Sequence, residues 1–170
     1  MKILETERLK LRRITTYDSA FIIELLNDPS FIKNIGDKKV RSEEDAHKYI
    51  LNGPVLSYEK HGFGLYLVEL KNSGTPIGIC GLIKRDNLDD VDVGFAFLSD
   101  YRCKGYAFES ASAVVEYGRK NFGLKRVLGI TTPENIPSIN VLQKIGLTFE
   151  TMIKMTDDEP EIKLFAVNFD

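Results

Sequence analysis

The stretch that decides the fold is SDYRCKGYAFES, residues 99–110. It follows the apolar segment VDVGFAFL at 91–98, which has the pattern of a buried strand, and it leads into an amphipathic segment at 107–122. The sequence therefore predicts a strand, a short glycine loop and a long helix in direct succession. The first N–H groups of a helix lack internal partners and the helix dipole is positive there, so such a loop can bind an anion. Because Arg102 and Lys104 add two positive charges, the ligand that we expect is a phosphate or a diphosphate.

The same loop also has a purely structural interpretation. Gly105 can serve only to supply a positive φ angle before the helix, and both cations can be hydrated. The sequence contains neither the GxxxxGK[ST] nor the GxGxxG pattern, so it supports neither a P-loop nor a Rossmann-type nucleotide site. Since short glycine motifs are not specific, both interpretations stay open at this point.

Composition restricts the class of protein. The chain has 170 residues, 43% of them hydrophobic and 28% charged, with a net charge of −2. These values predict one globular domain, 1–170, and they lack the basic excess of a nucleic-acid-binding protein. The sequence has no apolar run long enough for a membrane span, and MKILETERLK at 1–10 has no apolar signal core. We therefore expect a cytoplasmic protein without membrane attachment. The two histidines and two cysteines form no ligand pattern, so neither a disulfide nor a metal site is predicted.

The order of the predicted elements indicates a mixed sheet. Helices are expected from Thr15 to Pro29, from Ser42 to about 51, from 107 to 122, and in the segment between Pro137 and Gly146, and they lie on both faces of the sheet. Strands are predicted, in chain order, at 8–14, 63–70, 76–83, 91–98, 126–132, 149–155 and 162–169.

Two motifs carry a resemblance to a known family. RCKGYA at 102–107 fits the R/Q-x-x-G-x-G/A pattern of the GNAT superfamily of N-acetyltransferases. ENIPSINVLQKIGLTFE at 134–150 resembles the second signature of that superfamily, N-x-x-S-x-x-x-L-x-K-x-G-F, although Leu147 stands where phenylalanine is usual. The opening ETERLKLRRITTYD at 5–18 looks like the RimJ/RimL-type branch, which acetylates the N-termini of ribosomal proteins. The resemblance thus covers nearly the whole chain. The residues that match the second signature are Asn135, Ser138, Leu142, Lys144 and Gly146.

The resemblance implies both a fold and a reaction. The implied fold is an α/β (α+β) domain of GNAT type, with a mixed, mostly antiparallel sheet of about seven strands, helices on both faces, and a splay between the fourth and fifth strands. The implied reaction passes an acetyl group from acetyl-CoA directly to a primary amine, without a metal. A homodimer is compatible with the family.

The resemblance also assigns residues to the donor. Backbone N–H groups of 102–108 would hold the diphosphate. The strand edge at 95–99, where it splays from 127–131, would pair with the pantetheine arm, and an N–H near Phe97 or Leu98 would polarise the thioester carbonyl. Asn135 would bond the pantetheine amides, Asn140 is a weaker candidate, and Lys144 would reach a phosphate. The complete set of predicted donor-binding residues is Phe97, Leu98, Ser99, Arg102, Cys103, Lys104, Gly105, Tyr106, Ala107, Phe108, Asn135, Asn140 and Lys144.

Three residues are candidates for catalysis. Asp92, on the central strand, is the first candidate for the base that deprotonates the amine, and the alternative is a solvated acidic turn. Glu69 is the second candidate, and its alternative is an exposed strand face. Ser138 is expected to donate to the departing thiolate, and its alternative is a capping role in the helix. A nucleophilic Cys103 is not favoured, because no histidine lies near it in the sequence.

The acceptor is left open by the sequence. The first two predicted helices with their loop, 27–40, and the acidic bend DNLDDVD at 86–92 are expected to select it. The bend would favour a cationic amine unless it is only a solvated turn. The usual acceptor of the branch is a protein N-terminal α-amine. The alternatives are a small-molecule amine (a polyamine, an antibiotic or an amino-acid derivative) and a non-catalytic acetyl-CoA sensor. A metal-dependent phosphate-ester enzyme is the least supported.

Overall fold

The strand, glycine loop and helix predicted around residue 105 are all present. The structure is a computed structural model and describes residues 2–170. In it, β5 (Asp92–Phe97) leads through a short 3-10 turn, η3 (Ser99–Tyr101), into α5 (Tyr106–Phe122). Gly105 is the N-cap of α5 with φ 84°, and Gly123 closes the helix with φ 63°. Both positions therefore require the left-handed conformation that glycine adopts at little cost.

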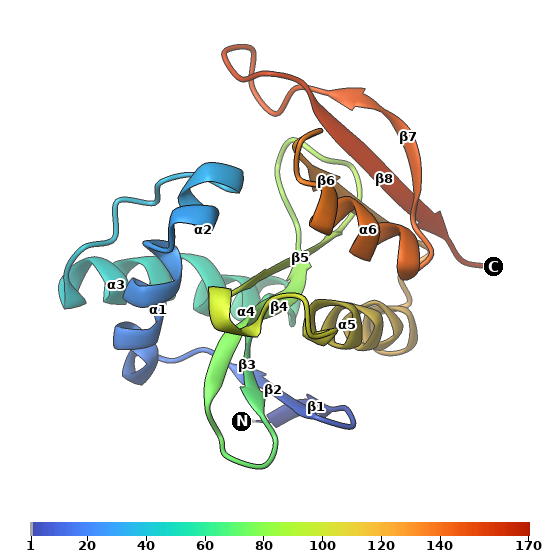
Figure 1. Cartoon of the computed structure of the whole chain (residues 1–170). Helices are drawn as coiled ribbons and strands as arrows, with labels where there is room; N and C mark the ends of the chain where they lie inside the picture. The colour runs from blue at the N-terminus through green and yellow to red at the C-terminus, as the bar shows by residue number, and fades with distance from the viewer. Residues whose placement is uncertain (1) are drawn as a thin grey trace.

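The eight strands form one sheet in the order β1-β2-β3-β4-β5-β6-β8-β7 (Figure 1). The sheet has one strand more than predicted, because the short β1 pairs antiparallel with β2. Lys2 and Glu5 are exposed, while Ile3 and Leu4 are half-buried against the core. The segment is too short for a clear apolar alternation, so the sequence did not predict it as a strand. The strands other than β5 are β1 (Lys2–Glu5), β2 (Leu9–Arg13), β3 (Leu65–Leu70), β4 (Pro76–Ile83), β6 (Arg126–Thr131), β7 (Thr148–Ile153) and β8 (Ile162–Asn168).

The sheet opens between β5 and β6. These strands run parallel, and within residues 2–170 the register joins them at the single pair Asp92 and Leu128. All the other neighbouring strands pair antiparallel over longer stretches. This confirms the splay predicted between the strands at 91–98 and 126–132, which are β5 and β6 in the structure. One edge of β5 therefore lacks a strand partner beyond Asp92.

Helices cover both faces of the sheet, as predicted. One difference concerns Pro29, which was expected to end a helix. The first helix already ends at Leu26, and Pro29 instead begins α2, where Asp28 is the N-cap and accepts a hydrogen bond from the Ser30 N–H. Proline suits this first helical position because its missing N–H is not needed there. The remaining elements are η1 (Thr16–Asp18), α1 (Ser19–Leu26), α2 (Pro29–Asn34), α3 (Glu43–Ile50), the π-helical turn η2 (Leu51–Val55), α4 (Leu56–His61) and α6 (Ile136–Lys144).

The two faces of β5 contribute to two separate cores. Val93 and Phe97 pack in the cluster that includes α5 and α6, whereas Ala96 packs in the cluster that includes α1 and α3. Figure 1 shows α5 and α6 on one side of β5 and α1 to α3 on the other. Successive side chains of β5 therefore point to opposite faces of the sheet, and β5 lies between the two helical layers. Within residues 2–170, each helix is too short or too polar to cross a lipid bilayer.

Candidate active site

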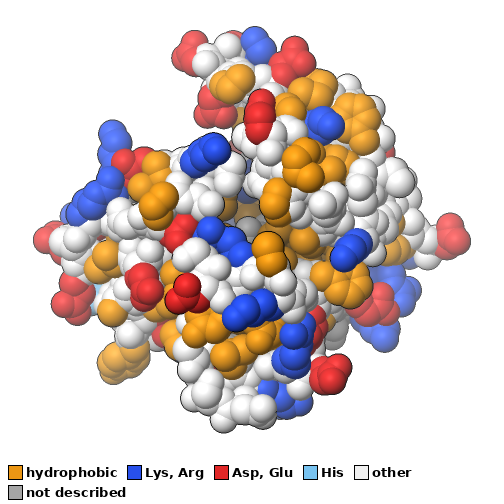
Figure 2. Space-filling model, viewed as in Figure 1, with side chains coloured by type: hydrophobic (Ala, Val, Ile, Leu, Met, Phe, Trp, Pro, Cys, Tyr) orange, Lys and Arg blue, Asp and Glu red, His pale blue; other side chains and the backbone are white. Residues whose placement is uncertain are grey.

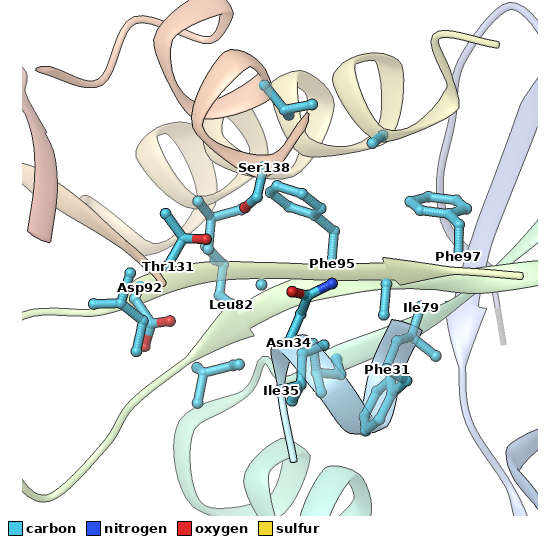
Figure 3. A pocket seen from close by; sticks show the side chains of 18 of the residues that line it. Phe31, Asn34, Ile35, Ile79, Leu82, Asp92, Phe95, Phe97, Thr131 and Ser138 are labelled. Atoms are coloured by element: carbon cyan, nitrogen blue, oxygen red, sulfur yellow. The ribbon is translucent and has the colours of Figure 1, made fainter. Parts of the chain in front are cut away.

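A cleft of about 960 Å³ follows the open edge of β5. Its walls come from α5 and α6 on one face of the sheet and from α2 and α4 on the other. Figure 3 shows Phe95 and Ser138 on one side of β5 and Phe31 and Ile35 on the other. Figure 2 shows the surface hollowed between the segments that carry α2 and α6. A ligand in this cleft can therefore contact both helical layers.

One end of the cleft is formed by backbone N–H groups in the loop before α5 and in the first turn of that helix. The Arg102 N–H donates to the Ser99 carbonyl at 3.3 Å, and the Glu109 N–H donates to the Gly105 carbonyl at 3.0 Å. Within residues 2–170, the N–H groups of 103–108 have no protein acceptor. Cys103 has φ 61°, which is uncommon for a residue with a side chain. Successive free N–H groups in a loop of this kind suit an anion, so the loop fits the diphosphate predicted for it.

The two cations of this loop make contacts within the protein, and their predicted part in binding a phosphate stays a prediction. Arg102 donates from Nη2 to the Asp28 carboxylate at 2.6 Å and from Nε to the Phe97 carbonyl at 3.0 Å. The charge of Arg102 is therefore already paired, and the side chain ties the loop to the end of β5 and to the N-cap of α2. The Lys104 ammonium lies 5.9 Å from the Tyr101 ring centroid, and Lys104 is not among the residues that line the cleft.

A third cation, which the sequence analysis missed, lies beside the loop. Arg8 Nη1 donates to the Lys104 carbonyl at 3.0 Å, and its guanidinium lies 4.3 Å from the Tyr106 ring centroid. Glu109 pairs with Arg8 at 2.7 Å. No local pattern could reveal this contact, because about a hundred residues of chain separate Arg8 from the loop.

The predicted strand-edge residues divide into two groups. Phe97 lines the cleft, whereas Leu98 and Ser99 do not. The Leu98 N–H donates to the Ile77 carbonyl of β4 at 3.0 Å, so it is not available to a ligand. Because hydrogen-bonding directions alternate along a strand, the Phe97 N–H points to the opposite edge, toward the splay. Of the two N–H groups considered for the thioester carbonyl, the structure therefore favours that of Phe97.

Asp92 lies at the inner end of the cleft and is only 1% exposed. Burial raises the pKa of its carboxyl group, although the Arg85 guanidinium, with Nε 3.0 Å away, opposes this shift. Figure 3 shows the carboxylate of Asp92 on the same strand as Phe95 and Phe97. The carboxyl group is not part of a solvated turn, and its raised pKa is a property expected of a general base.

Glu69 lies away from the other candidates. It is buried on β3, where its carboxylate pairs with Arg12 at 3.0 Å and with Lys10 at 3.3 Å. It does not line the cleft. The structure therefore brings Asp92 and Ser138 to one cleft and leaves Glu69 outside it.

Ser138 and Asn135 form the first turn of α6. The Asn135 side chain is the N-cap and accepts the Ser138 N–H at 3.3 Å. Both residues line the cleft, together with Asn140 and Lys144. The cap uses only the Asn135 oxygen and the Ser138 backbone, so the Asn135 amide N–H₂ and the Ser138 hydroxyl can still serve a ligand. Within residues 2–170, no three His, Cys, Asp or Glu side chains lie close enough together to hold a metal ion.

Comparison with known proteins identifies the family of this arrangement. The model of the acetyltransferase (GNAT) domain family matches residues 8–148. An uncharacterized N-acetyltransferase of Bacillus subtilis, YnaD, is 32% identical over 89% of this chain and 85% of its own length.

Solved structures show the same fold. A GNAT-family acetyltransferase from Bacillus anthracis is 26% identical and superposes with a TM-score of 0.80, covering 99% of this chain and 98% of its own. RimL, a ribosomal α-N-protein acetyltransferase solved with coenzyme A, superposes with a TM-score of 0.86 at 17% identity, covering 100% of this chain and 99% of its own.

We predict that Gly105→Val weakens coenzyme A binding at least about tenfold, equivalent to ~1.4 kcal/mol. The branched side chain resists φ 84°, and its Cβ would lie 3.2 Å from Nη2 of Arg8, the side chain that donates to the loop carbonyl of Lys104. Isothermal titration calorimetry with coenzyme A measures the change.

Gly123→Val is the matched control for this variant. Gly123 has φ 63° at the other end of the same helix, and a Cβ atom there meets no other atom within 4 Å. It therefore has a similar backbone strain without contact to the loop. Equal coenzyme A affinities for the two variants contradict the assignment of the loop to the diphosphate.

Proposed function

The chain belongs to the GNAT family of acetyltransferases, and we propose that it acetylates the α-amine of a protein N-terminus with acetyl-CoA. The observation that carries the proposal is the continuous cleft that joins the free N–H groups before α5 to the buried Asp92 carboxylate and then reaches α2 and α4. The fold shared with RimL, a protein α-N-acetyltransferase, supports the choice of acceptor. When bound, acetyl-CoA supplies an activated acetyl thioester.

The residues of the chain can position both partners of this reaction. The N–H groups of 103–108 hold the diphosphate, and the Phe97 N–H polarises the acetyl carbonyl from the open edge of β5. The Ser138 hydroxyl donates a hydrogen bond to the sulfur that departs. A thiol of pKa about 8.5 leaves more easily when its developing charge meets such a donor.

Asp92 removes the proton of the attacking amine. A protonated α-amine has a pKa of about 8, below the value of about 10.4 for a lysine side chain, so a base of lower pKa is enough to deprotonate it. A carboxylate is such a base, and burial raises the pKa of Asp92 toward that of the amine. The Arg85 guanidinium, with Nε 3.0 Å from the carboxylate, opposes this rise and favours the ionised form.

The proposal is tested with purified protein, acetyl-CoA and a panel of amines. The panel contains unblocked peptides, the same peptides with a blocked N-terminus and a free lysine side chain, and polyamines. We expect mass spectrometry to find the acetyl group on the α-amine. Asp92→Asn should lower kcat by about 10²-fold or more while coenzyme A affinity persists, whereas Glu69→Gln should retain kcat.

Two outcomes contradict the proposal. Acetylation of polyamines without acetylation of any peptide indicates a small-molecule enzyme. Binding of acetyl-CoA without turnover on the whole panel indicates a sensor.

The pH dependence of kcat/KM provides a separate prediction. The base acts in its ionised form, so activity falls as the pH drops through the raised pKa of Asp92. Arg85→Gln removes the cation that opposes this shift, and we expect the acidic limb of the profile to move to higher pH. Arg85→Lys keeps the charge and should leave the limb near its original position. If Arg85→Gln leaves the acidic limb where it was, Asp92 is not the base.

A further inference from the structure

The wall of the cleft is positive although the whole chain is negative. The chain has a net charge of −2. The cleft is lined by two carboxylates, Asp86 and Asp92, and by six cationic side chains, which are Lys38, Lys60, Lys84, Arg85, Arg102 and Lys144. An excess of one sign in a concave site attracts ligands of the opposite sign.

Part of this positive charge is already neutralised or lies at the donor end. Arg102 pairs with Asp28, and Arg85 pairs with Asp92. Lys144 lies on α6, on the donor side of the cleft. We call the opposite side of the cleft, which α2 and α4 line, the acceptor side. Positive charge at the acceptor side must come from residues other than these three.

Three lysines supply it. Among residues 2–170, no carboxylate lies within 4.0 Å of the ammonium groups of Lys38, Lys60 or Lys84. The Lys84 ammonium donates to the carbonyls of Leu88 and Arg85, at 2.7 and 3.1 Å, which leaves its charge uncompensated. Against these three lysines stands one carboxylate, Asp86.

The acidic bend that the sequence placed near the acceptor does not reverse this balance. Asp89 and Asp90 do not line the cleft, and the Asp90 carboxylate pairs with Arg126 at 3.3 Å. Two of the four carboxylates of the bend therefore do not face the cleft, which weakens the expectation that the bend attracts a cationic amine.

Resting on the proposed function, we propose that the preferred acceptor is an acidic N-terminal segment, with Asp or Glu side chains in the first few positions behind the reacting amine. The amine approaches Asp92, and the acidic side chains that follow meet the lysines at the acceptor side. Ile35 and Leu56 line the same side and are 48% and 37% exposed. They provide apolar contact for a peptide, which a small anion does not require.

The test compares peptides of equal length that share the first residue and differ at positions two to four, which are all acidic, all neutral amide or all basic. We expect kcat/KM to be about tenfold higher for the acidic peptide than for the neutral peptide, and lowest for the basic peptide. Because exposed charges are screened by salt, this difference should shrink at ~0.5 M NaCl.

Charge-reversal variants locate the effect. Lys38→Glu and Lys60→Glu, singly and together, should lower the ratio of kcat/KM for the acidic peptide to kcat/KM for the neutral peptide. Lys33→Glu is the matched control, since Lys33 is an exposed lysine of α2 that does not line the cleft, and it should retain the preference.

The outcomes separate the inference from the function on which it rests. Equal kcat/KM for acidic and neutral peptides, or a preference that survives both reversals together, overturns the inference while α-amine acetylation stands. Failure to acetylate any of the three peptides overturns the proposed function and the inference with it.

Discussion

The departure of β5 from β6 after the single pair Asp92 and Leu128 is the constraint on which the site depends. A strand edge inside a sheet normally satisfies its N–H and C=O groups with its neighbour. Here the edge of β5 beyond Asp92 faces the cleft instead. An extended amide chain such as pantetheine can complete that edge as an added strand does. Because β5 leads directly into the loop before α5, a single ligand in the cleft can contact both the strand edge and the free N–H groups.

Arg102 connects the two sides of this site. Its guanidinium joins the Phe97 carbonyl at the end of β5 to the Asp28 carboxylate that caps α2. The interaction is charge-assisted and partly buried. Because α2 lines the cleft opposite α5 and α6, the positions of the loop before α5 and of that wall depend on a common side chain. The phosphate contact that the motif suggested for Arg102 stays a prediction.

Local patterns predicted the parts of the fold that local chemistry determines. The alternation along β5, the helix after Gly105 and the loop before it follow from side-chain periodicity and from the need for a positive φ angle. The sequence pattern could not reveal that Arg8 lies on Tyr106, that Glu69 is neutralised by Lys10 and Arg12, or that Arg85 faces Asp92, because tertiary packing brings these pairs together. Pro29 was misread for a related reason, since proline follows one helix and begins the next equally well.

The assignment of the cleft to acetyl-CoA depends on the proposal that the main-chain N–H groups of 103–108 bind the diphosphate of coenzyme A. A crystal structure of the complex with coenzyme A can test this. We expect diphosphate oxygens within hydrogen-bonding distance, about 2.7–3.2 Å, of several N–H groups of residues 103–108. Coenzyme A bound elsewhere, with these N–H groups solvated, contradicts it.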